Sequence, residues 1–103
     1  MLHPIFKAQL PVVSKLLKEQ KIKTAYAFGS VVSENFNDNS DIDLLVNFED
    51  GLEPLEKGEL CWTLHDALRK IFNREVDILI EGSLKNPYFI EEINEKKELI
   101  YAA

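Results

Sequence analysis

The fold of this chain is decided by the stretch AFGSVVSENFNDNSDIDLLV, residues 27–46. The apolar run Thr24–Phe28 leads into it and predicts a buried strand, which Gly29 and Ser30 break. The quoted stretch ends inside a second run, Asp41–Phe48, which predicts a second strand. The polar residues between the two runs are typical of a short helical turn and a loop. The stretch therefore predicts two strands joined by a Gly-Ser turn and a polar connection.

Two carboxylates open the second strand at positions i and i+2. Because side chains alternate between the two faces of a strand, Asp41 and Asp43 are expected on one face. Two like charges this close repel each other unless a cation lies between them. Mg²⁺ suits such a pair, since it takes oxygen ligands and is often held by one or two carboxylates together with substrate phosphates. The pair therefore predicts a magnesium site.

The Gly-Ser turn is the second half of the predicted site. Glycine lets the backbone approach an anion closely, and Ser30 adds a hydroxyl. The N–H groups of a following helical turn can also face a phosphate. Gly29 and Ser30 are therefore predicted to bind phosphate.

A third acid lies on a later strand. The apolar run Val76–Ile80 predicts this strand, and Asp77 interrupts the run. Burying a lone carboxylate is expensive, so Asp77 needs either a functional partner or a place at the surface. If this strand lies beside the second one, Asp77 can join Asp41 and Asp43. The alternative is a surface acid at a strand edge.

Length, charge and cysteine content limit the function. The 103 residues predict a single domain, residues 1–103, without room for a separate substrate-binding domain. Eighteen acids against twelve bases give a net charge of −6, which argues against a polynucleotide as the main ligand. One cysteine excludes an internal disulfide, and no signal peptide or membrane span is recognisable. A cytoplasmic location is therefore expected.

The remaining segments predict helices. Apolar residues at helical spacing predict a long helix over Pro54–Phe72. An earlier helix is expected from about Pro11 to Gln20, with its proline in the first turn; the alternative is an earlier start with a kink. A short helix is expected over about Tyr88–Glu95, and Leu99–Tyr101 either forms an edge strand or covers the core.

Two side chains of the long helix need separate explanations. Trp62 lies off the apolar stripe, and a large exposed aromatic side chain is costly without a contact. It therefore either belongs to a partner surface or packs over the N-terminal helix. Cys61 lies in the apolar pattern and is expected to be a small buried hydrophobe, not a reactive thiol.

Gly29-Ser30, ten further residues and then Asp41-Ile42-Asp43 resemble the nucleotidyltransferase signature of the DNA polymerase beta superfamily. Either half alone would be a weak signal, but both at this spacing, each at a strand edge, are fairly specific. The short chain is similar to the minimal nucleotidyltransferase (MNT) family, and Val76-Asp77 resembles the context of that family's third acid. The order of elements over nearly the whole chain then suits an α/β (α+β), nucleotidyltransferase-like fold, a small mixed sheet with helices mainly on one face.

The resemblance implies Mg²⁺-dependent transfer of AMP from ATP to a hydroxyl. Asp41, Asp43 and Asp77 would be the catalytic residues and would hold two Mg²⁺ ions, and Gly29 and Ser30 would bind the β,γ-phosphates. Stand-alone members of the family look like antitoxins that modify a tyrosine of a HEPN-type toxin. The resemblance therefore implies a helical HEPN partner. No membrane partner is expected, because the sequence has no apolar run long enough to span a membrane, and a homo-oligomer is compatible with the sequence.

The chain departs from the family pattern after the Gly-Ser pair. Members often have an Arg-Gly pair shortly after it, where this chain has Val31-Val32-Ser33-Glu34. An arginine there could steady a triphosphate, and the sequence offers no evident replacement. Two other hypotheses follow: a catalytically degenerate MNT-like module that neutralises a partner by occlusion, and a small-molecule nucleotidyltransferase, whose acceptor pocket a short chain can hardly build alone.

Overall fold

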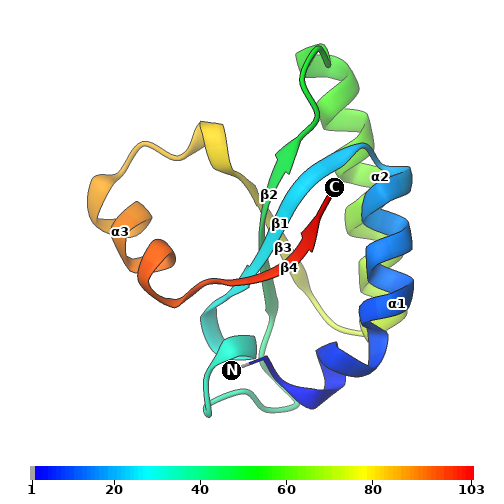
Figure 1. The fold of residues 1–103 in the computed structure, drawn as a ribbon. Helices are drawn as coiled ribbons and strands as arrows, with labels where there is room; N and C mark the ends of the chain where they lie inside the picture. The colour runs from blue at the N-terminus through cyan, green and yellow to red at the C-terminus, as the bar shows by residue number, and fades with distance from the viewer. Residues whose placement is uncertain (1) are drawn as a thin grey trace.

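The computed structural model describes residues 2–103, whose strands form one mixed four-stranded sheet (Figure 1). The strand order is β3-β2-β1-β4, with β1 antiparallel to both β2 and β4, and β2 parallel to β3. The elements in chain order are α1 (Pro4–Glu19), β1 (Ile22–Phe28), the 3-10 turn η1 (Gly29–Val32), β2 (Ile42–Phe48), α2 (Pro54–Phe72), β3 (Val76–Ile80), the 3-10 turn η2 (Glu81–Ser83), α3 (Pro87–Lys96) and β4 (Glu98–Ala102). The predicted α+β class and mixed sheet are confirmed.

The helices lie on both faces of the sheet, but unequally. Helices α1 and α2 cover one face, and α3 alone lies over the other (Figure 1). The core lies under α1 and α2, and its fully buried side chains include Phe6, Val13, Leu17, Ile42, Leu44, Val46, Leu64 and Leu68. Because side chains alternate along a strand, the β2 residues between these core positions, Asp43 and Leu45, face the side of α3.

Helix α1 begins at Pro4, so the predicted start near Pro11 is wrong and the alternative of an earlier start holds. The Nδ1 atom of His3 accepts a hydrogen bond of 3.2 Å from the Ile5 N–H and caps the helix. Pro11 lacks one helical hydrogen bond at an exposed position, where water can reach the freed carbonyl. The longer helix buries Phe6, whose ring centroid lies 5.0 Å from that of Phe72, and this apolar contact outweighs the lost hydrogen bond.

The other predicted elements lie close to their expected bounds. The long helix and the third strand were predicted at Pro54–Phe72 and Val76–Ile80, as found, and the C-terminal residues form the edge strand β4. The second strand begins at Ile42, whose N–H donates a 3.0 Å hydrogen bond to the Glu75 carbonyl, so Asp41 lies just before the strand. None of the helices in residues 2–103 has the length and apolarity needed to cross a membrane.

Candidate active site

The sheet brings the predicted phosphate turn and two of the predicted acids together. Phe28 pairs with Asp43 across the antiparallel strands β1 and β2, so Gly29 follows directly beside that carboxylate. Asp43 is also the register partner of Asp77 on the parallel strand β3. The condition for a joint site, that the third strand lies next to the second, is therefore met.

The pKa of the Asp43 carboxyl shows how strongly these acids affect one another. Its pKa is raised to about 6, first by burial, then by the negative charges of Asp77 and Asp41, and also by a hydrogen bond with the Asp77 side chain. Two carboxyl groups can share a hydrogen bond only when one of them holds a proton. The repulsion between Asp41 and Asp43 that the sequence predicts is present, but Asp77 raises the pKa of Asp43 more than Asp41 does.

Asp41 lies in a different position from the other two acids. It is exposed and lines a cavity on the side of the Arg74 loop, whereas Asp43 and Asp77 line a cavity under α3. As the side chains stand, residues 2–103 contain no group of three His, Cys, Asp or Glu side chains arranged around one metal position. The Asp43–Asp77 pair nevertheless fits Mg²⁺, because it offers hard oxygen ligands whose mutual repulsion a divalent cation would relieve.

Gly29 is fitted to Asp43. It has a φ of +73°, a backbone conformation that side chains rarely adopt, and a Cβ atom added to it would lie 2.5 Å from Oδ2 of Asp43. No other residue type therefore fits this position without moving the carboxylate. The sequence predicts that the backbone at this glycine comes close to an anion. In the structure it comes close to the Asp43 carboxylate.

Hydrogen bonds hold the η1 turn from several sides. The Ser30 hydroxyl donates to the Asp41 carbonyl at 3.4 Å, and the Ser33 hydroxyl donates to the Ser30 carbonyl at 3.0 Å. The His3 N–H donates to the Val31 carbonyl at 2.8 Å, which ties the start of α1 to the same turn. The Gly-Ser turn is therefore anchored to the residue that precedes β2 and to the N-terminal segment.

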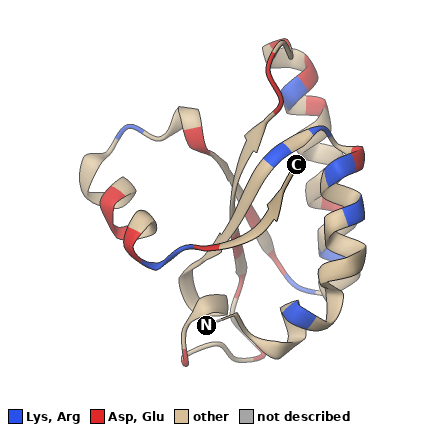
Figure 2. Cartoon of the chain, viewed as in Figure 1, with Lys and Arg blue, Asp and Glu red and all other residues tan. Residues whose placement is uncertain are grey.

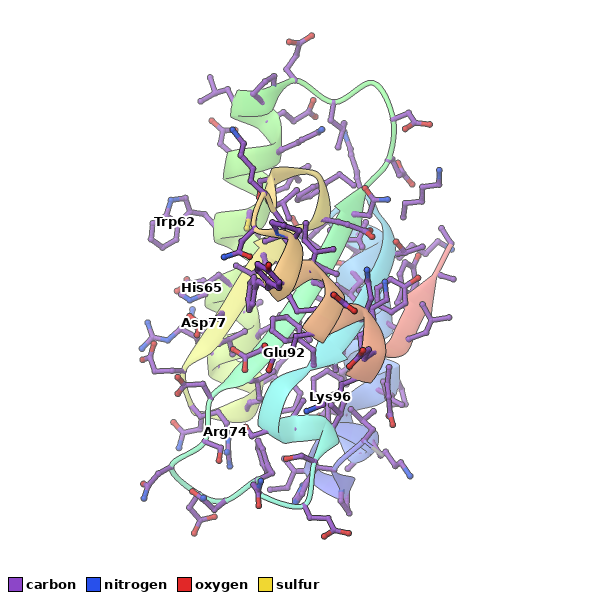
Figure 3. The ribbon with its side chains drawn as sticks, turned by 90° about the vertical axis from the view of Figure 1, so that its left-hand side faces the viewer. Trp62, His65, Arg74, Asp77, Glu92 and Lys96 are labelled. Atoms are coloured by element: carbon purple, nitrogen blue, oxygen red, sulfur yellow. The ribbon has the colours of Figure 1, made fainter. Side chains whose placement is uncertain are left out.

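Two cavities open between α3 and this end of the sheet (Figure 3). The first, of 380 Å³, is lined by Phe28, Gly29, Ser30, Ser33, Asn35, Phe89, Glu92, Ile93 and Lys96. The second, of 390 Å³, is lined by Phe28, Asp43, Asp77, Ile78, Leu79 and Phe89. Phe28 and Phe89 line both cavities, so the cavity at the Gly-Ser turn and the cavity at the two acids are neighbours. Glu92 and Lys96 were not predicted, because only the packing of α3 brings them here.

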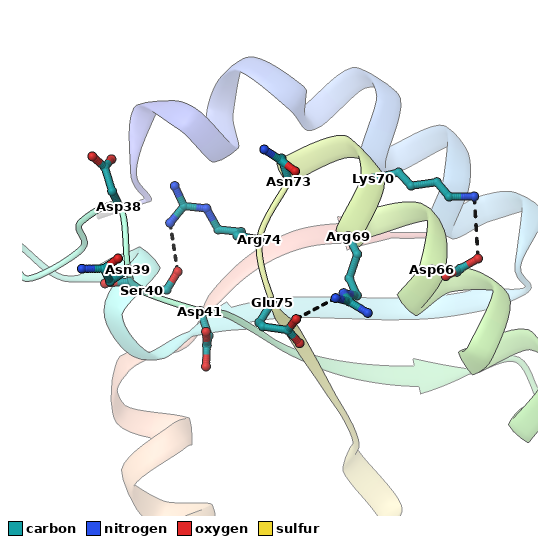
Figure 4. A pocket seen from close by; sticks show the side chains of 10 residues that line it. All are labelled: Asp38, Asn39, Ser40, Asp41, Asp66, Arg69, Lys70, Asn73, Arg74 and Glu75. Carbon is teal, nitrogen blue, oxygen red and sulfur yellow. Dashed lines mark hydrogen bonds and ion pairs between the residues drawn. The ribbon is translucent and has the colours of Figure 1, made fainter.

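Arg74 is a third residue near the site that the sequence does not predict. Its Nη1 atom donates to the carbonyls of Asn37 and Ser40 at 3.0 and 2.9 Å, and its guanidinium lies 4.5 Å from the centroid of the Phe36 ring. It lies in a 620 Å³ cavity beside Asp41 (Figure 4). Arg74 therefore holds in place the loop that delivers the chain to the acids; only its position just before β3 could have suggested this.

A fourth cavity lies between α2 and the edge strand β3. It has 430 Å³ and is lined by Gly58, Cys61, Trp62, His65, Val76, Asp77, Ile78 and Ile80. Trp62 is 72% exposed and meets the His65 ring edge-on, with ring centroids 5.8 Å apart, so it does not pack over α1. Cys61 is half-buried, and burial raises the pKa of its thiol, which fits an unreactive side chain. Asp77 lines both this groove and one of the cavities under α3, and Figure 3 shows it on the same side as Trp62 and His65.

Comparisons of the sequence with known proteins agree with this geometry. Residues 12–103 match the family model described as "Polymerase beta, Nucleotidyltransferase". The chain is 39% and 36% identical, each over 88 residues, to two proteins of Methanocaldococcus jannaschii named "Putative protein adenylyltransferase". Each of these alignments covers 84% of both chains.

Solved structures share the fold. A structure described as a "putative minimal nucleotidyltransferase" has a TM-score of 0.72 at 28% identity, and the match covers 95% of both chains. A chain of a toxin-antitoxin structure with AMP-PNP has a TM-score of 0.71 at 23% identity, covering 91% of this chain and 73% of that one. A chain from a complex of tri-AMPylated Shewanella oneidensis HEPN toxin and MNT antitoxin has a TM-score of 0.62 at 22% identity, covering 94% and 72%. The chain therefore belongs to the polymerase beta nucleotidyltransferase family.

Proposed function

We propose that this chain is a Mg²⁺-dependent adenylyltransferase that moves AMP from ATP to a hydroxyl of a partner protein, a tyrosine of a HEPN-type toxin, and so acts as an antitoxin. The observation that supports this most directly is the contact of the Gly29 turn with Asp43, which itself pairs with Asp77. Relatives named as protein adenylyltransferases support protein as the acceptor. Structures of the same fold with a HEPN toxin or AMP-PNP support the partner and the nucleotide.

Two of the five predicted residues are assigned to phosphate binding and three to metal binding. Gly29 and Ser30 bind the β,γ-phosphates in the cavity under α3, and Asp41, Asp43 and Asp77 hold the metal. Members of this family typically depend on a metal ion. When bound, Mg²⁺ supplies the positive charge that polarises the α-phosphate and stabilises the departing pyrophosphate. Asp41 would have to turn its exposed side chain toward Asp43 to join the other two acids as a metal ligand.

The acceptor approaches from the side of β3. In an in-line displacement the attacking hydroxyl and the leaving pyrophosphate lie on opposite sides of the α-phosphorus. With the pyrophosphate at Gly29 and Ser30, the opposite side is that of Asp77 and the groove of Trp62 and His65. Asp77 accepts the hydroxyl proton as the new O–P bond forms and the bond to the β-phosphate oxygen breaks. The products are an adenylylated partner and pyrophosphate.

Radiolabelled ATP tests this function. The protein is incubated with Mg²⁺, a candidate HEPN partner and ATP labelled either on the α- or on the γ-phosphate. We expect the α-label, and not the γ-label, to become covalently attached to the partner. Transfer of the γ-label would replace adenylylation by phosphorylation. A partner that is inhibited without any label would favour neutralisation by occlusion, the alternative that the missing arginine after Gly29-Ser30 supports.

A further inference from the structure

The two neighbouring cavities under α3, one at the Gly-Ser turn and one at Asp43 and Asp77, are poor in positive charge. Asp43, Asp77 and Glu92 line them, and among their lining residues only Lys96 carries a positive charge. Lys96 is in the last turn of α3 and shares the first cavity with Gly29 and Ser30 (Figure 3). A polyphosphate bound at that turn would therefore meet a single cationic side chain of this chain.

Lys96 is available for a ligand. Its neighbour Lys97 is engaged elsewhere, with its ammonium 4.1 Å from the centroid of the Tyr26 ring. The ion pairs formed within residues 2–103 use Lys21, Arg69 and Lys70, and none uses Lys96. Figure 2 shows acidic residues along α3 and positive charge where the helix ends, and α3 contacts η1. An exposed, unpaired lysine thus stands over the Gly-Ser turn.

We propose that Lys96 binds the β- or γ-phosphate of the nucleoside triphosphate and supplies the positive charge that the segment after Gly29-Ser30 lacks. This inference rests on the proposed function, because it takes the nucleotide to lie at that turn. An ammonium group on a flexible stem is a good phosphate ligand, since it acts as a point charge and needs no fixed orientation. Val32 and Glu34 offer no such group, and α3 offers it from across the cavity.

The negative charge of Glu92 should weaken phosphate binding by Lys96. It lies one helical turn before Lys96 and lines the same cavity. Its carboxylate repels a bound phosphate and attracts the Lys96 ammonium when no nucleotide is bound. Removal of this charge by Glu92→Gln should therefore strengthen triphosphate binding, whereas Lys96→Ala should weaken it. Opposite effects of two neighbouring substitutions are hard to obtain from a general loss of structure.

Calorimetry with two nucleotides tests the assignment. AMP-PNP carries the β- and γ-phosphates and resists transfer, and AMP lacks both groups. In the presence of Mg²⁺, we expect Lys96→Ala to weaken AMP-PNP binding about tenfold and to leave AMP binding unchanged. Lys96→Arg should restore most of the affinity. Lys85→Ala is the matched control, because Lys85 is exposed near the start of α3 and lies outside the residues that line this cavity.

The outcomes separate the inference from the function on which it rests. A wild-type protein that binds no AMP-PNP overturns both. If wild type binds AMP-PNP and Lys96→Ala binds it equally well, the function stands and the role of Lys96 is rejected. Equal losses for AMP-PNP and AMP, or an equal loss in Lys85→Ala, would also reject it, because they indicate a general effect of charge or folding.

Discussion

The Asp43 carboxylate occupies the space that a side chain on Gly29 would need, with Oδ2 2.5 Å from the position of a Cβ atom. The phosphate turn and the central acid therefore fix each other's position. The contact places the residue that follows β1 directly against Asp43 of β2. It also makes the site sensitive to a single methyl group.

Gly29→Ala is expected to destabilise the protein and to weaken nucleotide binding. The positive φ costs a residue with a Cβ about 1–2 kcal/mol, and displacement of Asp43 adds to that cost. Urea unfolding and AMP-PNP titration measure the two effects. Gly82→Ala is the control, because Gly82 opens the second Gly-Ser pair, lacks a positive φ and has no atom within 4 Å of an added Cβ. Equal behaviour of the two variants would contradict the contact with Asp43.

The raised pKa of Asp43 predicts how stability depends on pH. Its folded-state pKa of about 6 exceeds the ordinary value of 3.8, so the folded state binds the proton more tightly than the unfolded state. Protonation of Asp43 therefore stabilises the folded state; this contribution is complete below pH 4 and is lost as pH rises through 6. Without metal, Asp43→Asn should therefore melt at a higher temperature than wild type at pH 7.5, and this advantage should vanish near pH 4.

Magnesium should act on the same group. At pH 7.5 Asp43 is ionised and can bind Mg²⁺, whereas at pH 5 it is largely protonated. Mg²⁺ with ATP should therefore raise the melting temperature of wild type more at pH 7.5 than at pH 5, because a ligand of the native state stabilises it. Asp41→Asn combined with Asp43→Asn should show no such rise. A double variant that responds like wild type would place the metal elsewhere.

Trp62→Ala tests the side from which the acceptor approaches. Trp62 is exposed and lines a groove that Asp77 also lines, and the groove includes none of the residues of the phosphate turn. Its loss should reduce AMP transfer to the partner at least about tenfold and leave AMP-PNP affinity unchanged. Tyr88→Ala is the control, because Tyr88 is 83% exposed and lies outside this groove. Similar losses in both variants would show that the groove has no special role.

Local sequence patterns were enough to predict most of the fold. Helix α2 and strand β3 show clear periodicity or a short apolar run between turn residues, so their bounds were found. The start of α1 is an exception, because Pro11 is typical of a helix boundary but lies inside this helix. The earlier start depends on the burial of Phe6 against Phe72, a contact between residues far apart in the chain, which no local pattern shows.

In the candidate site, too, some residues could be predicted from local patterns and others depend on contacts between distant parts of the chain. Asp43 and Asp77 come together because neighbouring strands carry them, as their sequence context suggested. Lys96 and Arg74 reach the site from the last turn of α3 and from the connection before β3, so their roles depend on packing across the sheet. Spacing along the sequence does not show that Lys96 lines the cavity of the Gly-Ser turn or that Arg74 binds the loop before β2. The sequence alone therefore offers no candidate for the missing arginine.

The central claim is tested most directly by the intact mass of a HEPN partner after incubation with this protein and Mg-ATP. Wild type should yield a partner heavier by AMP units. Asp77→Asn should still co-purify with the partner but leave its mass unchanged, because it removes a metal ligand and proton acceptor without altering the wider surface. Asp50→Asn, an exposed acid between β2 and α2, should behave like wild type. A wild-type protein that inhibits the partner but leaves its mass unchanged with ATP, GTP, CTP and UTP would contradict the account.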